Sequence, residues 1–461
     1  MPEPLDTDVA IVGAGVVGCA IARELTRFEL RVTLLEAGPD VGAGTSKANT
    51  ALLHTGFDAK PGTLEARLLA RGYELLGEYA ERVGIPVERT GALLVAWNDE
   101  QLAELPGIVE RARANGSTDL REVGVDELYR REPHLGPGAR GGLEVPREGL
   151  VCPFTTPLAY ATEAVLAGCD LRRSSPVSSV SRMERGGFRL ELPGGALSAR
   201  YLVNAAGLHS DELDRMLGHD RFTVTPRRGE LIVFDKLARP LVSQIVLAVP
   251  TKVTKGVLIA PTVFGNVMLG PTAEDLERKD DTESTRSGID YLRAEGARIM
   301  PELLEHEVTA VYAGLRAATE HPDYQLTVHA PEGYACVGGI RSTGLSASMA
   351  IAEHVRDELG AGGMPLEPKP AATAEFRMPN IGEAFERPYQ RREMIERDPE
   401  YGSIVCFCER VTHGEVRDAL EATVPATDLD GLRRRTRAHM GRCQGFFCGA
   451  ELAARLDESA R

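Results

Sequence analysis

The pattern of hydrophobic and polar positions near the start of the chain predicts a strand–helix–strand unit. An apolar, β-branched run at residues 7–12 (TDVAIV) leads into glycines and a helical pattern that continues to about Phe28. A second strand-like run follows at residues 31–36 (RVTLLE). The whole unit takes about 30 residues, which is the length of a βαβ unit with parallel strands. The chain is therefore expected to open with a sheet of the α/β class.

Later segments add a long helix and two strand-rich stretches. Between Thr63 and Val83, apolar residues recur at spacings of three and four, which indicates an amphipathic helix. Residues 176–207 read as short strands separated by Gly-Gly turns, and residues 222–272 form a second strand-rich stretch. Near Ala335 an apolar run meets glycines and a further helical pattern. These patterns predict an α/β (α+β) protein.

Composition places the chain among globular proteins of several domains. Of its 461 residues, 43% are hydrophobic and 26% are charged, which excludes a disordered or fibrous protein. The formal net charge of −15 disfavours nucleic acid and anionic lipid surfaces as partners, so an anionic substrate would need local arginines. The acidic N-terminus is unlike a secretory signal, and the longest apolar stretch, residues 9–22, is too short to span a bilayer. We therefore expect a cytoplasmic protein.

Three glycines after the first predicted strand form a dinucleotide-binding fingerprint. Gly13, Gly15 and Gly18 spell G-x-G-x-x-G at the start of a helix, where backbone amides can approach a diphosphate. Glu36 lies 18 residues beyond Gly18, at the end of the second strand, and its carboxylate suits the hydroxyls of an adenosine ribose. The strand–helix–strand context makes this a specific signal for a bound dinucleotide.

Three later segments favour FAD over NAD. These are GTSKANTALLHTG (44–56), YLVNAAG (201–207) and GGIRSTGLSAS (338–348), which supply glycines, strand ends and a helix start around a flavin ring. The sequence has no second G-x-G-x-x-G after a strand and no CxxC beside the fingerprint, which disfavours a separate NAD(P)H domain and a disulfide reductase. The predicted FAD contacts are Gly13, Gly15, Val16, Val17, Gly18, Glu36, Ala37, Thr45, Ser46, Asn49, Val177, Ala206, Gly207, Gly339, Arg341, Gly344, Leu345 and Ser346.

Over about residues 7–360 the chain resembles the D-amino-acid-oxidase-like superfamily of FAD oxidoreductases. The segments SKANTALLHTGFDAKPGTLEARL, VTPRRGELIVF, GNVMLGPTAED and GLRAATEHPDY look most like anaerobic, iron–sulfur-containing glycerol-3-phosphate dehydrogenases, with L-2-hydroxyglutarate oxidases next. The resemblance implies a Rossmann-like FAD domain (1–80, 145–222 and 310–361) with an inserted antiparallel-sheet substrate domain (81–144 and 223–309). It also implies that the substrate is oxidised at a carbon bearing a hydroxyl or amine.

The four cysteines of the tail (403–461) have the spacing of a cluster site. Cys406 and Cys408 form C-x-C, and Cys443 and Cys448 form C-x₄-C after 34 intervening residues. Four such thiolates can hold a [2Fe–2S] cluster or zinc, and the spacing departs from the paired C-x₂-C of zinc sites. LRRRTRAHMGRCQGFFC resembles the small helical [2Fe–2S] domain of bacterioferritin-associated ferredoxin, which favours the cluster and leaves zinc as the alternative.

Two features flank the cysteines. Repeated prolines in residues 362–402 indicate an extended linker before the tail. A basic run, Arg433 to Arg437, precedes Cys443. We interpret this run as a solvated helix face, with neutralisation of the cluster or docking of an acidic protein as alternatives.

Five residues are candidates for the chemistry. His54 lies in the segment that faces the ring and has an ordinary pKa near neutrality, which makes it the candidate base, although a ring-packing or backbone-bonded histidine is nearly as consistent with the pattern. Arg227 and Arg228 could clamp a phosphate or carboxylate. The resemblance implies that Arg316 contacts substrate and that Arg341 lies near the flavin.

The two cofactors together predict a dehydrogenase, and the resemblance implies that it oxidises sn-glycerol 3-phosphate to dihydroxyacetone phosphate. Electrons would leave FAD through the cluster toward a quinone or partner subunit, and the resemblance implies a partner complex at the inner membrane. The alternatives are an L-2-hydroxyglutarate-type oxidase, an amine or opine dehydrogenase subunit, and a non-enzymatic cluster carrier with a vestigial flavin fold. The sequence leaves the oligomeric state open.

Overall fold

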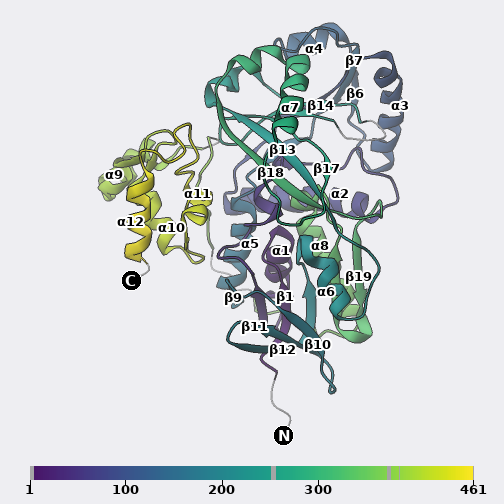
Figure 1. Cartoon of the computed structure of the whole chain (residues 1–461), viewed down its shortest axis with the longest axis vertical. Helices are drawn as coiled ribbons and strands as arrows, with labels where there is room; N and C mark the ends of the chain where they lie inside the picture. Colours follow the sequence, from purple (N-terminus) through teal and green to yellow (C-terminus); the bar gives the residue numbers. More distant parts are fainter. Residues whose placement is uncertain (1–4, 251–255, 371–374, 384, 460–461) are drawn as a thin grey trace.

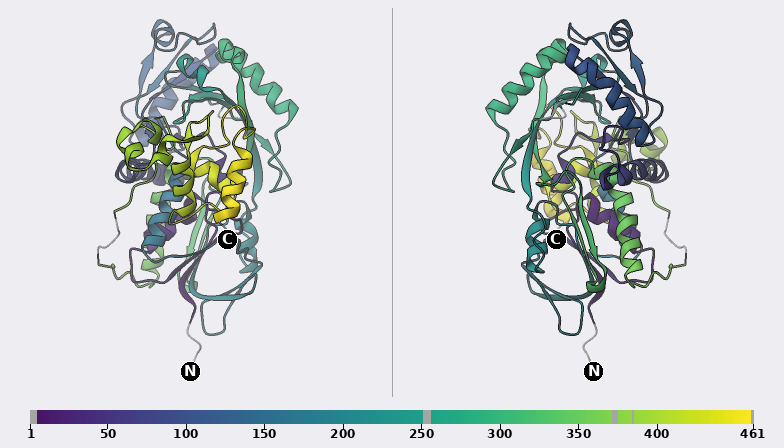
Figure 2. Two further views of the ribbon diagram at one scale, coloured as in Figure 1. Left: turned by 90° about the vertical axis from the view of Figure 1, so that its left-hand side faces the viewer. Right: turned by 90° about the vertical axis from the view of Figure 1, so that its right-hand side faces the viewer.

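A computed structural model of the chain describes residues 5–250, 256–370, 375–383 and 385–459. It has three parts: one mixed sheet with packed helices, a second and larger sheet, and a small helical group to one side of both (Figure 1). Seen from that side, the C-terminal helices lie across the body of the molecule (Figure 2). These parts confirm the predicted fold class.

The first sheet has eight strands, and its central strands run parallel. Their order is β10-β11-β12-β1-β2-β9, with β20 paired to the second half of β12 and β19 paired to β20. The bounds are β1 (Thr7–Val12), β2 (Val32–Leu35), β9 (Asp170–Arg172), β10 (Ser179–Arg182), β11 (Phe188–Leu192), β12 (Gly195–Asn204), β19 (Gln325–His329) and β20 (Tyr334–Gly338).

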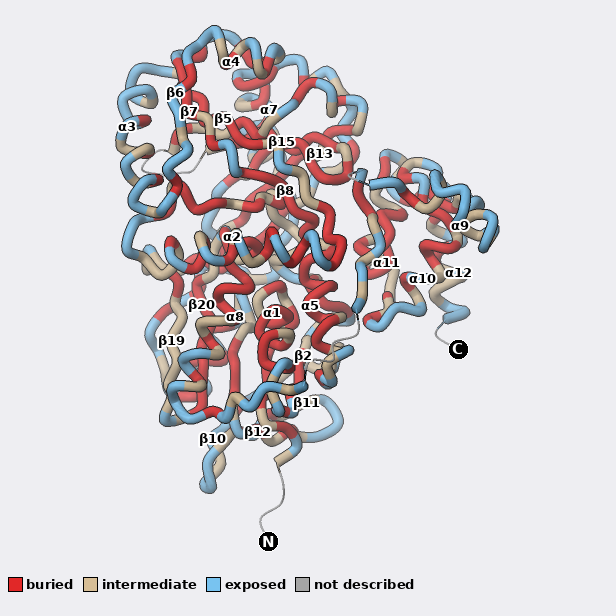
Figure 3. The backbone as a smooth tube through the Cα atoms, turned by 180° about the vertical axis from the view of Figure 1, so that it is seen from behind, coloured by how far each residue is buried: buried red, intermediate tan, exposed pale blue. Residues whose placement is uncertain are grey.

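Helices cover this sheet with small and aliphatic side chains. α1 (Val16–Leu25) packs against α5 (Thr155–Leu166) and α8 (Gly344–Ala361), and α2 (Leu64–Val83) packs against α8. The helix predicted over 63–83 is α2, which begins after its N-cap Thr63 and ends before Gly84 in the left-handed conformation, at φ +80°. Figure 3 shows buried backbone running through α1, α5 and α8. A short helix, α6 (Ser210–Met216), follows β12.

The second sheet has nine strands in the order β17-β13-β16-β15-β14-β5-β7-β6, with β18 paired to β13. Its strands are β5 (Ala92–Ala96), β6 (Arg121–Val123), β7 (Gly141–Val145), β13 (Thr225–Phe234), β14 (Ile245–Ala248), β15 (Leu258–Pro261), β16 (Val267–Gly270), β17 (Glu274–Asp275) and β18 (Val308–Ala318). Helices α3 (Asp99–Ala114), α4 (Val125–Arg131) and α7 (Arg286–Ile299) accompany it. A small third sheet has the order β3 (Leu52–Leu53), β8 (Gly149–Val151) and β4 (Val87–Glu88).

The long strand β18 shifts one predicted boundary. It pairs with β13 along ten positions, from Thr225↔Ala318 to Phe234↔Val308. It therefore belongs to the second sheet, whereas the sequence-based division ended the substrate domain at residue 309. β18 returns the chain from the second sheet to the first, and this places its last residues between the two.

The C-terminal part has its own core, and the segment before it is not extended throughout. It comprises α9 (Arg392–Arg397), β21 (Ile404–Cys406), β22 (Val411–Thr412), α10 (His413–Glu421), α11 (Leu429–Thr436) and α12 (Gly449–Ser459). Arg387 is buried and donates to Glu415 at 2.7 Å, so residues 387–402 pack with this part rather than forming an extended linker. Among the described residues, no helix is both long and apolar enough to cross a membrane.

Candidate cofactor and active site

Five of the predicted FAD contacts lie one to three residues after parallel strands of the first sheet. Gly13 follows β1, Glu36 follows β2, and Gly339 follows β20, while Ala206 and Gly207 come just after β12. The register pairs Val12 with both Leu35 and Asn204, and Asn204 with Cys336. Because carboxyl ends of parallel strands meet at one edge, these residues line the edge where α/β sheets bind nucleotides.

The glycine fingerprint has a geometry that other residues could not adopt. Gly13 has a φ of +102°, and a Cβ there would lie 2.4 Å from the carbonyl oxygen of Ala205. A Cβ on Gly18 would lie 1.8 Å from the carbonyl oxygen of Gly13. α1 begins after Gly15, which has no side chain to cap it, so this helix start can receive a diphosphate.

Glu36 already accepts hydrogen bonds from the fingerprint turn. Its carboxylate oxygens accept from the backbone N–H groups of Ala14 and Gly38, each at 2.8 Å, and the amide of Ala37 contributes as well. Burial raises the pKa of Glu36 above its ordinary value. The carboxylate is thus held beside the first turn of α1, as its proposed contact with a ribose requires.

The segment predicted to face the ring ties the fingerprint to β18. The hydroxyl of Ser46 accepts from the Val16 N–H at 2.9 Å, and the hydroxyl of Thr45 donates to the Leu315 carbonyl at 2.9 Å. Tyr312 donates to the Asn49 carbonyl at 3.1 Å. This segment therefore spans from α1 to the strand that carries Arg316.

A second helix start adjoins the first. α8 begins at Gly344 without a side-chain cap, and a Cβ on Gly344 would lie 3.9 Å from Cγ2 of Val17. The Ser346 hydroxyl accepts from the His54 N–H at 2.9 Å, and Leu345 is buried beside it. Two uncapped helix N-termini at one strand edge, with glycines where side chains would collide, fit an elongated anionic cofactor such as FAD. Val177, another predicted contact, packs like Ala206 against the hydrophobic cluster that includes Val12, Leu35 and Leu202.

His54 is held between two carboxylates. Its Nδ1 lies 3.0 Å from both oxygens of Glu148, and its Nε2 lies 3.0 Å from Asp58. Burial disfavours the charged ring, but Glu148 and Asp58 outweigh it and raise the pKa of His54 to about 10. At neutral pH the ring therefore carries a proton, and a role as base requires that this proton be lost first. Glu148 and Asp58 were not among the predicted site residues.

Arg316 is a guanidinium without a carboxylate partner in the described part of the chain. Both of its terminal nitrogens donate to the Thr272 carbonyl at 3.3 Å. Desolvation and the neighbouring Arg227 lower its pKa to about 10. Gly229 makes the room, since a Cβ there would lie 2.6 Å from the Arg316 guanidinium. A desolvated guanidinium whose hydrogen-bond partner is a neutral carbonyl is suited to bind an anion.

The other predicted arginines are paired with acidic side chains. Arg227 donates to both carboxylate oxygens of Asp275. Arg228 is buried and donates to the Glu274 carboxylate and to the Glu283 carbonyl. Arg341 donates to Glu65 at 2.8 Å and to the Pro322 carbonyl at 2.6 Å. Of the predicted arginines, Arg316 alone has no such partner within the residues that the structure describes, so it is the strongest candidate for substrate.

The four cysteines come together in two pairs. The side chains of Cys408 and Cys443 interact with each other, and so do those of Cys448 and Cys406. The backbone amide of Phe447, followed by the Cys408 thiol and the amides of residues 445 and 446, lowers the pKa of Cys443. Amides directed at a sulfur stabilise a thiolate ligand, and two pairs of sulfurs match the two irons of a [2Fe–2S] cluster. The residues present therefore fit that cluster.

The basic run before Cys443 is largely buried, so the prediction that it forms a solvated helix face is wrong. Arg434, Arg435 and Arg437 are 5%, 4% and 6% exposed. Arg434 and Arg435 bind Asp40 of the first sheet's loop, and Arg437 lies over the ring of Phe264 at 4.1 Å. The run docks the C-terminal part onto the rest of the chain.

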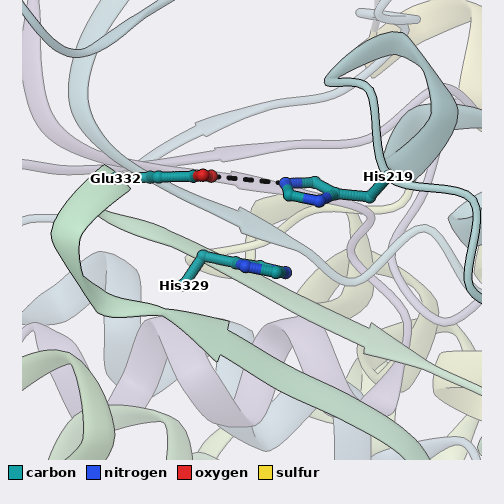
Figure 4. A group of neighbouring side chains, drawn as sticks. All are labelled: His219, His329 and Glu332. Atoms are coloured by element: carbon teal, nitrogen blue, oxygen red, sulfur yellow. Dashed lines mark hydrogen bonds and ion pairs between the residues drawn. The ribbon is translucent and has the colours of Figure 1, made fainter.

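A cluster of His219, His329 and Glu332 lies at another place, where the segment after α6 meets the end of β19 and the turn that follows it (Figure 4). The two imidazole rings are stacked, with centroids 4.0 Å apart, so their in-plane lone pairs do not converge on one point. Arg182 donates to both His219 and Glu332. A guanidinium already occupies the position of an ion, and we interpret the cluster as a hydrogen-bonded stack.

Comparisons with known proteins agree with this geometry. The family described as FAD dependent oxidoreductase matches residues 8–358, and the BFD-like [2Fe-2S] binding domain matches residues 404–458. The chain therefore belongs to the FAD dependent oxidoreductase family. The predictions of FAD, of a [2Fe–2S] cluster and of an oxidoreductase are confirmed.

Among the relatives, a glycerol 3-phosphate dehydrogenase of Caloramator mitchellensis is 36% identical over 96% of this chain and 92% of its own length. The solved structure of FAD-bound, dithionite-reduced L-alpha-glycerophosphate oxidase from Mycoplasma pneumoniae is 28% identical, with a TM-score of 0.77, over 81% of this chain and 99% of that one. A mitochondrial L-2-hydroxyglutarate dehydrogenase of Caenorhabditis elegans is 29% identical over 58% of this chain and 63% of its own length.

Proposed function

We propose that this protein oxidises sn-glycerol 3-phosphate to dihydroxyacetone phosphate. The observation that carries the proposal is Arg316, a desolvated guanidinium without a carboxylate partner in the described residues, on the strand that contacts the segment predicted to face the ring. A phosphate dianion would restore the charge balance that Arg316 lacks. The relative from Caloramator mitchellensis supports this choice of substrate.

The chain's residues would divide the work between binding and proton transfer. Bound FAD would accept the hydride from the carbinol carbon, and the [2Fe–2S] cluster would pass electrons on singly. Arg316 would hold the phosphate and so fix the carbinol carbon. His54, once deprotonated at Nε2, would take the hydroxyl proton at this nitrogen as the carbonyl forms. Glu148 would orient the ring by accepting the hydrogen bond of its other nitrogen, Nδ1.

The external acceptor and the cellular site belong to the same proposal. Electrons would pass from the cluster to a quinone or a partner subunit. We place the enzyme in the cytoplasm, with access to the inner membrane through such a partner. Phe407, Phe446 and Phe447, which are 71%, 84% and 72% exposed, lie beside the cysteine ligands and give the cluster an apolar rim.

An anaerobic half-reaction tests the substrate. Oxidised enzyme is mixed with sn-glycerol 3-phosphate, with L-2-hydroxyglutarate or with glycerol, and the flavin absorbance is followed. We expect fast bleaching with sn-glycerol 3-phosphate and no comparable bleaching with glycerol, which lacks the anion that Arg316 would bind. Faster bleaching with L-2-hydroxyglutarate would mean that Arg316 binds the carboxylate of a hydroxy acid, and it would refute the proposal.

A further inference from the structure

We propose that Asp40 is a positioning residue that locks the cluster domain onto the flavin-binding loop, so that electron transfer from flavin to cluster depends on it. The inference rests on the proposed function only for the existence of two redox cofactors in sequence. It concerns a carboxylate that contacts neither the predicted substrate site nor the cysteines, and that the sequence analysis did not single out.

Asp40 is fully buried and forms ion pairs with two arginines of the basic run in the C-terminal part. Its side chain is 0% exposed. Arg434 donates to Oδ2 at 2.7 Å, and Arg435 donates to both oxygens at 2.7 Å. A third guanidinium, that of Arg173, lies 3.8 Å away. Asp40 is thus the shared counter-charge of an ionic joint between two parts of the chain.

The joint is built on the loop that carries predicted FAD contacts. Asp40 stands between Glu36 and Ser46, and within this loop the Gly42 N–H donates to the Ala14 carbonyl of the fingerprint turn at 2.8 Å. Lys47, next to Ser46, forms an ion pair with Asp430 of α11 at 3.0 Å. α11 therefore contacts the same loop at two points, through Asp430 and through Arg434 and Arg435.

The other end of α11 reaches a cysteine ligand and the second sheet. Arg437 follows the helix and donates to Glu409, the neighbour of Cys408, at 3.3 Å. It also donates to Asn266 at 3.2 Å and covers the ring of Phe264. α11 with Arg437 therefore spans from the flavin loop to the cluster loop.

This arrangement has a direct consequence for electron transfer. The rate at which one electron passes from a reduced flavin to an oxidised cluster falls steeply with the distance between them. Replacing Asp40 by Asn would keep the side chain's size but leave Arg435 buried without its counter-charge and Arg434 with Asp430 as its one remaining carboxylate partner among the described residues, which disfavours the docked position. The flavin itself and the substrate site would be unchanged.

The experiment compares the holoenzyme with Asp40→Asn, using photoreduction of the flavin so that the result does not depend on the substrate. Transfer to the cluster is followed by rapid-freeze paramagnetic resonance, and the molecular envelope is measured by small-angle X-ray scattering. We expect an unchanged rate of flavin photoreduction, at least tenfold slower appearance of the reduced-cluster signal, and a larger radius of gyration.

Two further variants keep the test decisive. Asp430→Asn removes the partly exposed second contact and is expected to give the same pattern with a smaller change, which serves if Asp40→Asn does not fold. Asp8→Asn breaks the surface pair with Arg31 in the same sheet and is expected to change nothing. Unchanged cluster reduction and scattering in both interface variants would overturn the proposal, as would an equal slowing of flavin and cluster reduction.

Discussion

The chemistry of single residues depends on partners that are distant in sequence. His54 is predictable from its place in a segment rich in glycine and small polar residues, and Asp58 lies four residues after it in the sequence. Glu148, however, lies 94 residues further on, and no local pattern marks it as the partner of His54. Sequence reasoning could therefore find the candidate base but not the pair of carboxylates that keeps it protonated.

We expect the rate of flavin reduction by substrate to rise with pH toward about pH 10. A base must be deprotonated to accept the hydroxyl proton, and the pKa of His54 is about 10. Stopped-flow rates between pH 6 and 10 measure the slope. In His54→Gln the rate should be lower and the slope absent. A wild-type rate that is flat over this range would show that His54 acts as a charged group and not as the base.

The same ion pairs predict a pH-dependent contribution to stability. Because the folded-state pKa of His54 lies above its ordinary value of 6.5, its stabilising effect is fully present below pH 6.5 and is lost as the pH rises through about 10. The difference in Tm between the wild type and His54→Gln should therefore shrink as the pH is raised from 6.5 to 10. A constant difference would mean that the carboxylates do not hold a protonated ring.

Arg316→Met should weaken substrate binding without unfolding the protein. A hydrogen-bonded charge pair contributes about 1.5–3 kcal/mol, which corresponds to a rise of about 10- to 100-fold in KM for sn-glycerol 3-phosphate. Arg278→Ala removes an exposed arginine of the same domain and is the matched control, with KM unchanged. If the KM of Arg316→Met stayed at the wild-type value, the phosphate would have to bind elsewhere.

At the scale of elements, the strand–turn–helix unit is the part that the sequence determines most fully. β1 occupies the predicted residues 7–12, and β2 lies within the predicted 31–36. The requirement is local: Gly13 needs a positive φ, and Gly18 needs space beside the turn. α11 is the opposite case, since its arginines look like a surface in the sequence and are buried only because Asp40, 394 residues before Arg434, lies against them.

Gly15→Ala should separate folding from FAD binding. Gly15 has a φ of −70°, which any residue adopts, and a Cβ would lie 3.3 Å from the hydroxyl of Ser46. The fold should persist, while the methyl group obstructs the approach of the diphosphate and weakens FAD binding by about tenfold or more. Flavin content and the Tm of the FAD-free protein measure the two effects. Gly124→Ala, at the open start of α4, is the control, and equal flavin content in the two variants would refute the assignment.

At the scale of the whole molecule, the two sheet-bearing parts share one large hydrophobic core, and the C-terminal part has a core of its own. The sequence predicts two sheet-bearing parts and a cysteine-bearing tail, because each has its own hydrophobic pattern. It ends the substrate domain before β18, which pairs with β13, and it treats residues 387–402 as a linker although Arg387 is buried against the C-terminal part, because both contacts are non-local. How the tail docks depends entirely on such contacts.

Cys443→Ser should interrupt the electron path after the flavin. The variant should retain FAD and bleach with substrate at the wild-type rate, because Cys443 lies outside the first sheet's strand edge. It should lose the paramagnetic signal of the reduced cluster and most turnover with a quinone acceptor. Cys169→Ser, at a buried cysteine of the first part, is expected to keep the cluster signal. Normal quinone turnover in Cys443→Ser would show that electrons leave directly from the flavin.

The most direct measurement is an anaerobic titration of the purified holoenzyme with sn-glycerol 3-phosphate, followed by visible absorption and paramagnetic resonance together. We expect the yellow flavin absorption to bleach and the signal of a reduced [2Fe–2S] cluster to grow in the same titration. A flavin that stays oxidised, or one that bleaches while the cluster remains oxidised, would contradict the account.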